Sequence, residues 1–81
     1  MTELRQLRHF VALAEYGPFA RAAEAVNLSQ PALSRSIQAL ESQLDCRLLD
    51  GNPRGITLTA HGRLVLEHAR RLLAGSRALD N

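Results

Sequence analysis

The residues with the clearest chemical potential lie in the run SQPALSRSIQALESQL, from position 29 to position 44. Gln30 and Ser34 are four residues apart, so on a helix they share one face. A glutamine amide can form paired hydrogen bonds with the N6 and N7 atoms of adenine, and a serine hydroxyl can form a hydrogen bond with several different base edges. Pro31 offers an apolar surface to a thymine methyl group. We therefore predict that Gln30, Pro31 and Ser34 contact DNA bases. The alternative is a solvated polar face, which every surface helix has.

A second set of residues suits the DNA backbone. Positioning on DNA depends on charge and hydrogen-bond donors rather than on base identity, and the candidates are Ser29, Arg35, Gln38 and Arg54. Arg54 lies in a stretch rich in turn formers, and at a hairpin tip it is suited to a narrow minor groove, where the negative potential favours arginine. For a single surface arginine, an ion pair or free solvation is the alternative.

Residues that could support catalysis or bind a metal lack a useful arrangement. Cys46, His9, His61 and His68 match neither a zinc-ligand spacing nor a nucleophile and base. His61 and His68 are seven residues apart on one expected helix, about two turns, which is too far for one metal ion. No glycine-rich phosphate-binding loop is present. We predict no enzymatic activity, no metal and no cofactor.

Composition and charge are those of a small globular domain. The chain has 81 residues and a net charge of +2, and all 10 of its basic residues are arginine, which suits bidentate contacts with phosphate or guanine. The single Cys46 excludes an internal disulfide and fits a reducing compartment. No apolar run approaches the ~20 residues of a membrane span, and no signal peptide is recognisable. We expect a cytoplasmic protein with no membrane partner.

The hydrophobic pattern predicts the elements that position these residues. Apolar spacing predicts a helix from Glu3 to Tyr16, ended by a positive φ at Gly17 and by Pro18. A short alanine-rich helix begins at Phe19. A break at 27–29 follows, in which Asn27 tolerates the left-handed conformation and Ser29 caps the next helix, over residues 30–44. Leu33, Ile37, Leu40 and Leu44 form the buried stripe of that helix.

The remaining chain changes character. Arg47–Leu49 and Ile56–Leu58 are short strand candidates, and residues 50–55 between them are dense in turn formers, so we predict a small β-wing. Thr59 is then the N-cap of a long last helix. Part of the apolar ridge of this helix has no evident partner in so small a domain, which predicts self-association. The predicted dimerisation residues are Val65, Leu66, Ala69, Leu72 and Leu73.

The same residues resemble a known family. Runs at 4–10, 28–37 and 47–49, together with Ala22-Ala23, Leu40-Glu41 and Leu58-Thr59 followed by Gly62, are similar to the amino-terminal DNA-binding domain of LysR-type transcriptional regulators. The resemblance covers nearly the whole chain, and the SQPALSR run in this context is highly specific.

The resemblance implies a mainly α fold. A winged helix-turn-helix of three helices with a small two-stranded β-wing is expected over residues 1–58, and a long linker helix for dimerisation over 59–81. Helix 30–44 is then expected in the major groove and wing 50–55 at the minor groove of a pseudo-palindromic promoter site bound by a homodimer. A small-molecule inducer is expected to act only through a larger carboxy-terminal domain, which we expect to follow beyond Asn81 in a longer regulator.

The sequence departs from the family pattern at the anchoring positions. The hydroxyl residues usual on either side of Phe19 are replaced by Pro18 and Ala20, and a usual wing arginine is replaced by Gly51. A Gly-Val or Gly-Thr pair before Arg47 is replaced by Asp45-Cys46. Losing an N-cap hydroxyl costs about 1 kcal/mol of helix stability. We therefore expect an intact base-reading set with atypical anchoring, in which the wing depends more on Arg54.

Two functions of different classes compete. The first is a sequence-specific DNA-binding module of a transcriptional regulator, and the second is a helical protein-interaction or dimerisation module that never touches DNA. Salt-dependent binding to duplex DNA separates them, because only the first releases counterions from phosphates.

Overall fold

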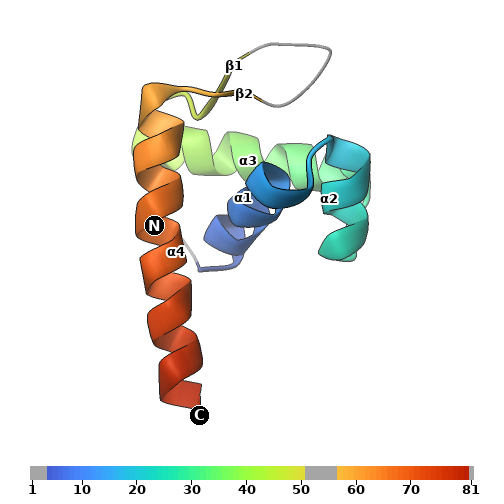
Figure 1. Cartoon of the computed structure of the whole chain (residues 1–81). Helices are drawn as coiled ribbons and strands as arrows, with labels where there is room; N and C mark the ends of the chain where they lie inside the picture. Colours follow the sequence, from blue (N-terminus) through green and yellow to red (C-terminus); the bar gives the residue numbers. More distant parts are fainter. Residues whose placement is uncertain (1–3, 51–56, 81) are drawn as a thin grey trace.

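The computed structural model describes residues 4–50 and 57–80, and only the backbone of residues 75–80. In this part of the chain the elements follow the predicted order, and Figure 1 shows α3 crossing α1 while the far end of α4 extends beyond the other helices. The mainly α, winged helix-turn-helix architecture is confirmed. The elements are α1 (Leu4–Tyr16), α2 (Phe19–Ala25), α3 (Gln30–Leu44), β1 (Leu49–Asp50), β2 (Thr57–Leu58) and α4 (Ala60–Asp80).

Helix α1 ends by a different mechanism from the one predicted. The expected positive φ at Gly17 is wrong, since no glycine in the described part of the chain has one. The Gly17 N–H still donates to the Leu13 carbonyl at 3.0 Å, and the Gly17–Pro18 peptide bond is cis. Pro18 is sufficient to stop the helix, because proline lacks an N–H and disfavours helical geometry in the residue before it.

The junction between α2 and α3 follows the prediction. Asn27 adopts the left-handed conformation with φ of 58°, which its short polar side chain tolerates. Ser29 is the N-cap of α3, and its hydroxyl oxygen accepts the Ala32 N–H at 3.2 Å. Pro31 occupies the first turn, where a missing N–H costs nothing. These local features determine where α3 begins and hence which residues its first turn presents.

The core lies between α1, α3 and the loop that leads to the wing. Small side chains let α2 approach closely, since Ala22 and Ala23 are only 0% and 3% exposed. Complete burial of one large apolar side chain contributes about 1.5–3 kcal/mol, so a domain of this size depends on very few of them. The largest fully buried side chains are Phe10, Leu13, Leu33, Ile37, Leu40 and Leu48.

Within the described residues, the first strand of the wing begins two residues later than predicted. Leu49 pairs with Leu58, and Asp50 pairs with Thr57, in an antiparallel sheet of two strands. Leu48 was expected in the first strand but lies before it, and its side chain is fully buried. Its N–H donates to a carboxylate oxygen of Glu41 at 2.7 Å instead of to a neighbouring strand. Glu41 thereby connects α3 to the base of the wing.

The start of α4 packs tightly on the same loop. The Thr59 N–H donates to the Leu48 carbonyl at 3.0 Å, and the Thr59 hydroxyl donates to the Arg47 carbonyl. The same hydroxyl oxygen accepts the Gly62 N–H at 2.9 Å, which confirms the predicted N-cap. A Cβ atom on Gly62 would lie 2.3 Å from the Leu48 carbonyl oxygen, so this position requires glycine. Helix α4 is therefore closely attached to the wing and, through Glu41, to α3.

Candidate nucleic-acid interface

Helix α3 presents a polar face opposite its buried stripe. Gln30, Pro31, Arg35 and Gln38 are exposed, and Ser34 is half-buried at the edge of the same face. Leu33, Ile37 and Leu40 lie on the other side and are at most 2% exposed. The three predicted base contacts, Gln30, Pro31 and Ser34, are thus brought together at the amino-terminal end of one helix, where major-groove readers place their base-contacting side chains.

Ser29 can serve the helix and a ligand together. Its oxygen accepts the Ala32 N–H, which leaves its own O–H free to donate to a phosphate oxygen. Arg35 forms no ion pair or hydrogen bond with any residue whose side chain the structure describes, so its guanidinium is available to a phosphate group. The positive end of the α3 dipole lies at Ser29 and favours an anion there.

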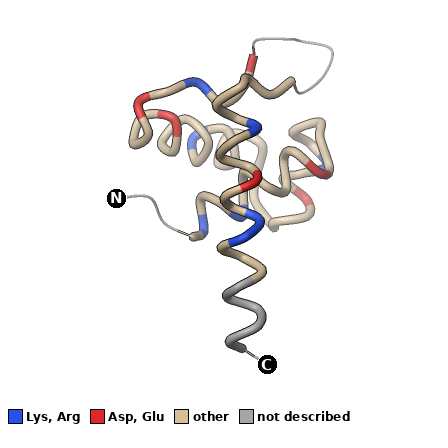
Figure 2. Tube along the Cα trace, turned by 60° about the vertical axis from the view of Figure 1, so that its left-hand side comes forward, with Lys and Arg blue, Asp and Glu red and all other residues tan. Residues whose placement is uncertain are grey.

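Charge alone does not define the interface. Figure 2 shows basic and acidic positions alternating along the chain rather than forming one basic segment. Two arginines that sequence reasoning did not single out flank the wing: Arg47 is exposed, and the Arg63 guanidinium donates to the Leu58 carbonyl at 3.3 Å. Their closeness to the wing in sequence was the available signal. Arg54 and Gly51 lie outside the described residues.

The structure divides the predicted dimerisation residues between two faces of α4. Ala69 is 0% exposed and Leu73 is 8% exposed, because both face the chain's own core, and neither is available to a partner. Val65 and Leu66 are partly buried against the same core. Of the five, Leu72 remains well exposed at 42%. Sequence periodicity located the ridge but could not show that α1 already covers much of it.

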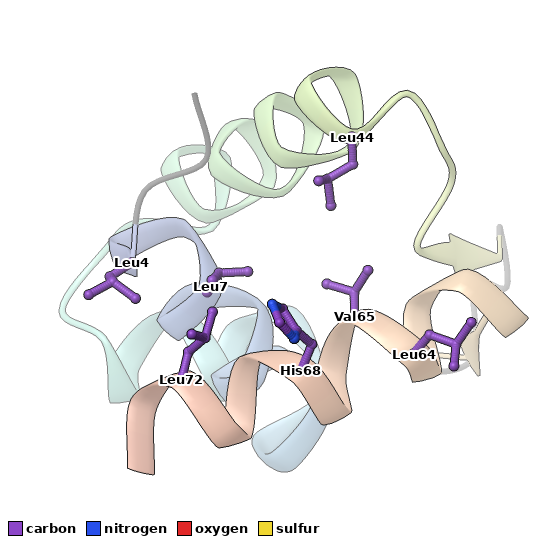
Figure 3. Close-up of a pocket in the computed structure, with 7 residues that line it drawn as sticks. All are labelled: Leu4, Leu7, Leu44, Leu64, Val65, His68 and Leu72. Atoms are coloured by element: carbon purple, nitrogen blue, oxygen red, sulfur yellow. The ribbon is translucent and has the colours of Figure 1, made fainter. Parts of the chain in front are cut away.

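The accessible apolar surface is instead a groove formed by three helices. It has a volume of about 400 Å³ and is lined mainly by aliphatic side chains. Figure 3 shows Val65, His68 and Leu72 of α4 on the side that faces α1 and Leu44 at the end of α3, with Leu64 at one end of the row. The α4 residues lining this groove are Leu64, Val65, His68 and Leu72. Because Leu44 ends α3 whereas Gln30 begins it, the groove and the polar face are separate surfaces.

His9 is the buried titratable group of the described residues. His9 is only 9% exposed, and its Nδ1 lies 2.7 Å from the Ser36 hydroxyl oxygen of α3. Burial lowers the pKa of His9 below its usual 6.5, and the nearby Arg5 charge lowers it further. Sequence reasoning treated His9 only as a possible metal ligand. Its spacing from Ala12 and Leu13 on the buried face of α1 was the signal that it packs inside.

The lowered pKa of His9 predicts a pH-dependent stability. The unfolded chain binds more protons than the folded one below pH 6.5, so the free energy of unfolding should fall as the pH drops through this range and level off below the folded pKa. His9→Gln should remove this component. Urea denaturation of both proteins between about pH 8 and pH 5 measures the difference. Two curves that stay parallel throughout would contradict the prediction.

No described helix is long and apolar enough to cross a membrane. No group of three or more His, Cys, Asp or Glu side chains there is placed to hold a metal ion.

Comparison with known proteins identifies similar sequences. The family model described as "Bacterial regulatory helix-turn-helix protein, lysR family" matches residues 4–63. The "SDS degradation transcriptional activation protein" of Pseudomonas sp. (strain ATCC 19151) is 82% identical over 79 residues, which are 98% of this chain and 26% of that protein. The HTH-type transcriptional regulator TfdT of Cupriavidus pinatubonensis (strain JMP 134 / LMG 1197) is 50% identical over 72 residues, 89% of this chain and 32% of that protein. The chain thus spans about a third or less of these relatives.

Solved structures with this fold include complexes with DNA. The CbnR_DBD–DNA complex matches with a TM-score of 0.89 and 48% sequence identity, covering 98% of this chain and 92% of that chain. The BenM_DBD/benA site 1 DNA complex matches with a TM-score of 0.92 and 38% identity, covering 96% of this chain and 91% of that chain.

Proposed function

Since the chain belongs to the LysR family of bacterial regulatory helix-turn-helix proteins, we propose that its α3 reads promoter DNA from the major groove as part of a homodimer. DNA binding in transcription regulation is the function of this family, whose named relatives are regulators and not enzymes. The proposal concerns the residues with which this chain contacts DNA and the dimer in which it binds DNA.

The proposal for base reading rests on one observation, the exposed polar face at the start of α3. Gln30 and Ser34 lie one turn apart there, with Pro31 beside them, while the opposite face of the helix is buried. In the proposed complex these three side chains contact base edges. Ser29, Arg35 and Gln38 contact the backbone and so set the position of α3 in the groove. Arg54 is proposed to enter the minor groove from the wing.

We expect Gln30→Ala to weaken binding to the cognate duplex by about 1–3 kcal/mol and to relax base preference at the position that Gln30 reads. Ser34→Ala should do the same at a neighbouring position. The matched control is Gln43→Ala, because Gln43 is an exposed glutamine on the same helix near its other end. Selection of bound sites from random duplexes identifies the cognate site, and titration at several salt concentrations then gives the affinities.

Each outcome of this experiment is informative. Unchanged affinities of Gln30→Ala for cognate and scrambled duplexes would contradict the reading assignment. Equal losses from Gln30→Ala and Gln43→Ala would indicate a general effect on α3 rather than a base contact. A wild-type chain that dimerises but binds no duplex at low salt would favour the alternative of an interaction module without DNA binding.

The proposed dimer uses the groove rather than the ridge predicted from sequence. Among the described residues, the exposed large hydrophobic side chains that line the groove are between 37% and 65% exposed: Leu4, Leu44, Leu64 and Leu72. Tyr16 is the exposed large hydrophobic residue of this part of the chain that lies outside the groove. Patches of this kind on small domains mark association surfaces. A second copy of α4 laid antiparallel into this groove forms a two-fold interface, in which each copy offers the same residues. The polar face of α3 stays free in that arrangement.

Such a dimer has a geometric consequence for the DNA site. Two copies of α3 related by a two-fold axis read the two halves of an inverted repeat. Recognition helices of this class reach successive major grooves about 34 Å apart along the duplex. Site selection therefore tests the dimer as well as the reader, because a single unrepeated half-site would contradict it.

The full regulator extends this function. The close similarity to the Pseudomonas "SDS degradation transcriptional activation protein" supports a related DNA site, so promoter DNA controlled by that relative is the first natural probe to use. A small-molecule inducer is proposed to act through a carboxy-terminal domain of the longer protein. The regulator is proposed to act in the cytoplasm, where bacterial promoters are found.

A further inference from the structure

The hydrogen bond between His9 and Ser36 joins α1 to the side of α3 that does not face the proposed DNA. Nδ1 of His9 and the Ser36 hydroxyl oxygen are 2.7 Å apart, and His9 is 9% exposed. Ser36 follows Ser34 by two residues, which on an α-helix is about 200° around the axis. The bond therefore holds the back of α3 directly behind its reading face.

A hydrogen bond adds a directional restraint to the apolar packing of α3. Leu33, Ile37 and Leu40 bury their side chains against α1 and the core, but hydrophobic contact has little directionality. A hydrogen bond restricts both distance and angle. Because His9 and Ser36 are 27 residues apart in sequence and lie on different helices, their bond constrains how one helix is rotated against the other.

We propose that His9 is a positioning residue, which acts through Ser36 to hold α3 at the rotation in which Gln30 and Ser34 discriminate between bases. This inference rests on the proposed function of α3 as a DNA reader. His9 itself touches no DNA in this arrangement, since it is buried between helices on the opposite side. Its contribution is therefore to discrimination between sequences more than to overall affinity, which phosphate contacts dominate.

The test compares four variants of this chain with the wild type: Ser36→Ala, Ser36→Thr, His9→Phe and the double variant His9→Phe/Ser36→Ala. Each is titrated with the selected duplex and with duplexes changed at the bases that Gln30 and Ser34 read. The measured quantity is the ratio of the two dissociation constants. Thermal denaturation of each variant is recorded in parallel, because a structural role would lower stability without changing this ratio in the folded protein.

We expect Ser36→Ala and His9→Phe each to lower the discrimination ratio about five-fold, the equivalent of one neutral hydrogen bond. The double variant should lose no more than either single one, because both remove the same bond. Ser36→Thr keeps the hydroxyl and should retain most of the discrimination. Ser36→Ala is a small change at a half-buried position, so this variant should fold. It gives a discrimination ratio even if His9→Phe fails to fold.

Four results would overturn the inference. Reduced stability with an unchanged ratio would show a purely structural bond, and additive losses in the double variant would show two independent effects. A wild-type chain that prefers no sequence would remove both this inference and the proposed function. Normal wild-type discrimination with unaffected Ser36→Ala and His9→Phe variants would remove this inference alone and leave the proposed function in place.

Discussion

Replacing Gly62 with alanine should destabilise the domain by about 2–3 kcal/mol, although alanine is ordinarily the better helix former. Gly62 lies in the first turn of α4, and a Cβ there would be 2.3 Å from the Leu48 carbonyl oxygen and 3.1 Å from the Leu48 carbonyl carbon. Both are backbone atoms, so no side-chain rotation relieves the contact. Either α4 or the loop before the wing has to move.

That movement affects the junction on which the wing depends. The carbonyl oxygen of Leu48 already accepts the Thr59 N–H at 3.0 Å, and Leu48 itself is fully buried. Displacing it weakens this bond and opens the packing around one of the largest core side chains. The expected gain of about 1 kcal/mol in helix propensity from glycine to alanine is smaller than these losses.

Chemical denaturation of Gly62→Ala and wild type at one pH measures the difference directly. His61→Ala is the matched control, because His61 is the preceding residue of the same helical turn and is exposed. It should change the free energy of unfolding by less than about 0.5 kcal/mol. Equal or higher stability of Gly62→Ala would show that the loop yields easily, and that α4 is less firmly attached to the wing than the contacts imply.

Local sequence signals predicted most of the fold because they act over a few residues. Asn27, Ser29, Pro31 and Thr59 determine helix ends through their own backbone preferences or hydroxyls, and the structure confirms each of them. Gly17 failed because Pro18 alone can end α1, which left the predicted positive φ unnecessary. Asp45 is a related case: it ends α3 in the left-handed conformation with φ of 52°, which a short polar side chain tolerates.

Features that join distant segments were not predictable in the same way. Periodicity gives the apolar ridge of α4 but not which helix packs on it, so Ala69 and Leu73 were assigned to a partner although they face the chain's own core. The bonds of His9 with Ser36, and of Glu41 with Leu48, cross between elements and leave no local pattern. The polar face of α3 was predictable because its residues follow helical spacing within one element.

The groove leads to the prediction with the largest effect on assembly. Leu72→Glu should raise the dissociation constant of the proposed dimer at least about 100-fold, because a two-fold interface would bury two copies of the introduced carboxylate in apolar surroundings. Leu72 is 42% exposed in the single chain, so the carboxylate can reach water there and the monomer should keep its fold. Leu64→Glu, at a residue that is 65% exposed, should act in the same way.

Residues of the original ridge make poorer probes. Leu66 packs partly against the core, so Leu66→Glu would destabilise the monomer and give an ambiguous loss of dimer. Tyr16→Glu is the better control, because Tyr16 is a large exposed hydrophobic residue, 52% exposed, that does not line the groove. Sedimentation equilibrium at high micromolar concentration should give dimers for the wild type and Tyr16→Glu and monomers for Leu72→Glu. A monomeric wild type, or a Leu72→Glu variant that associates normally, would mean that the second copy does not occupy this groove.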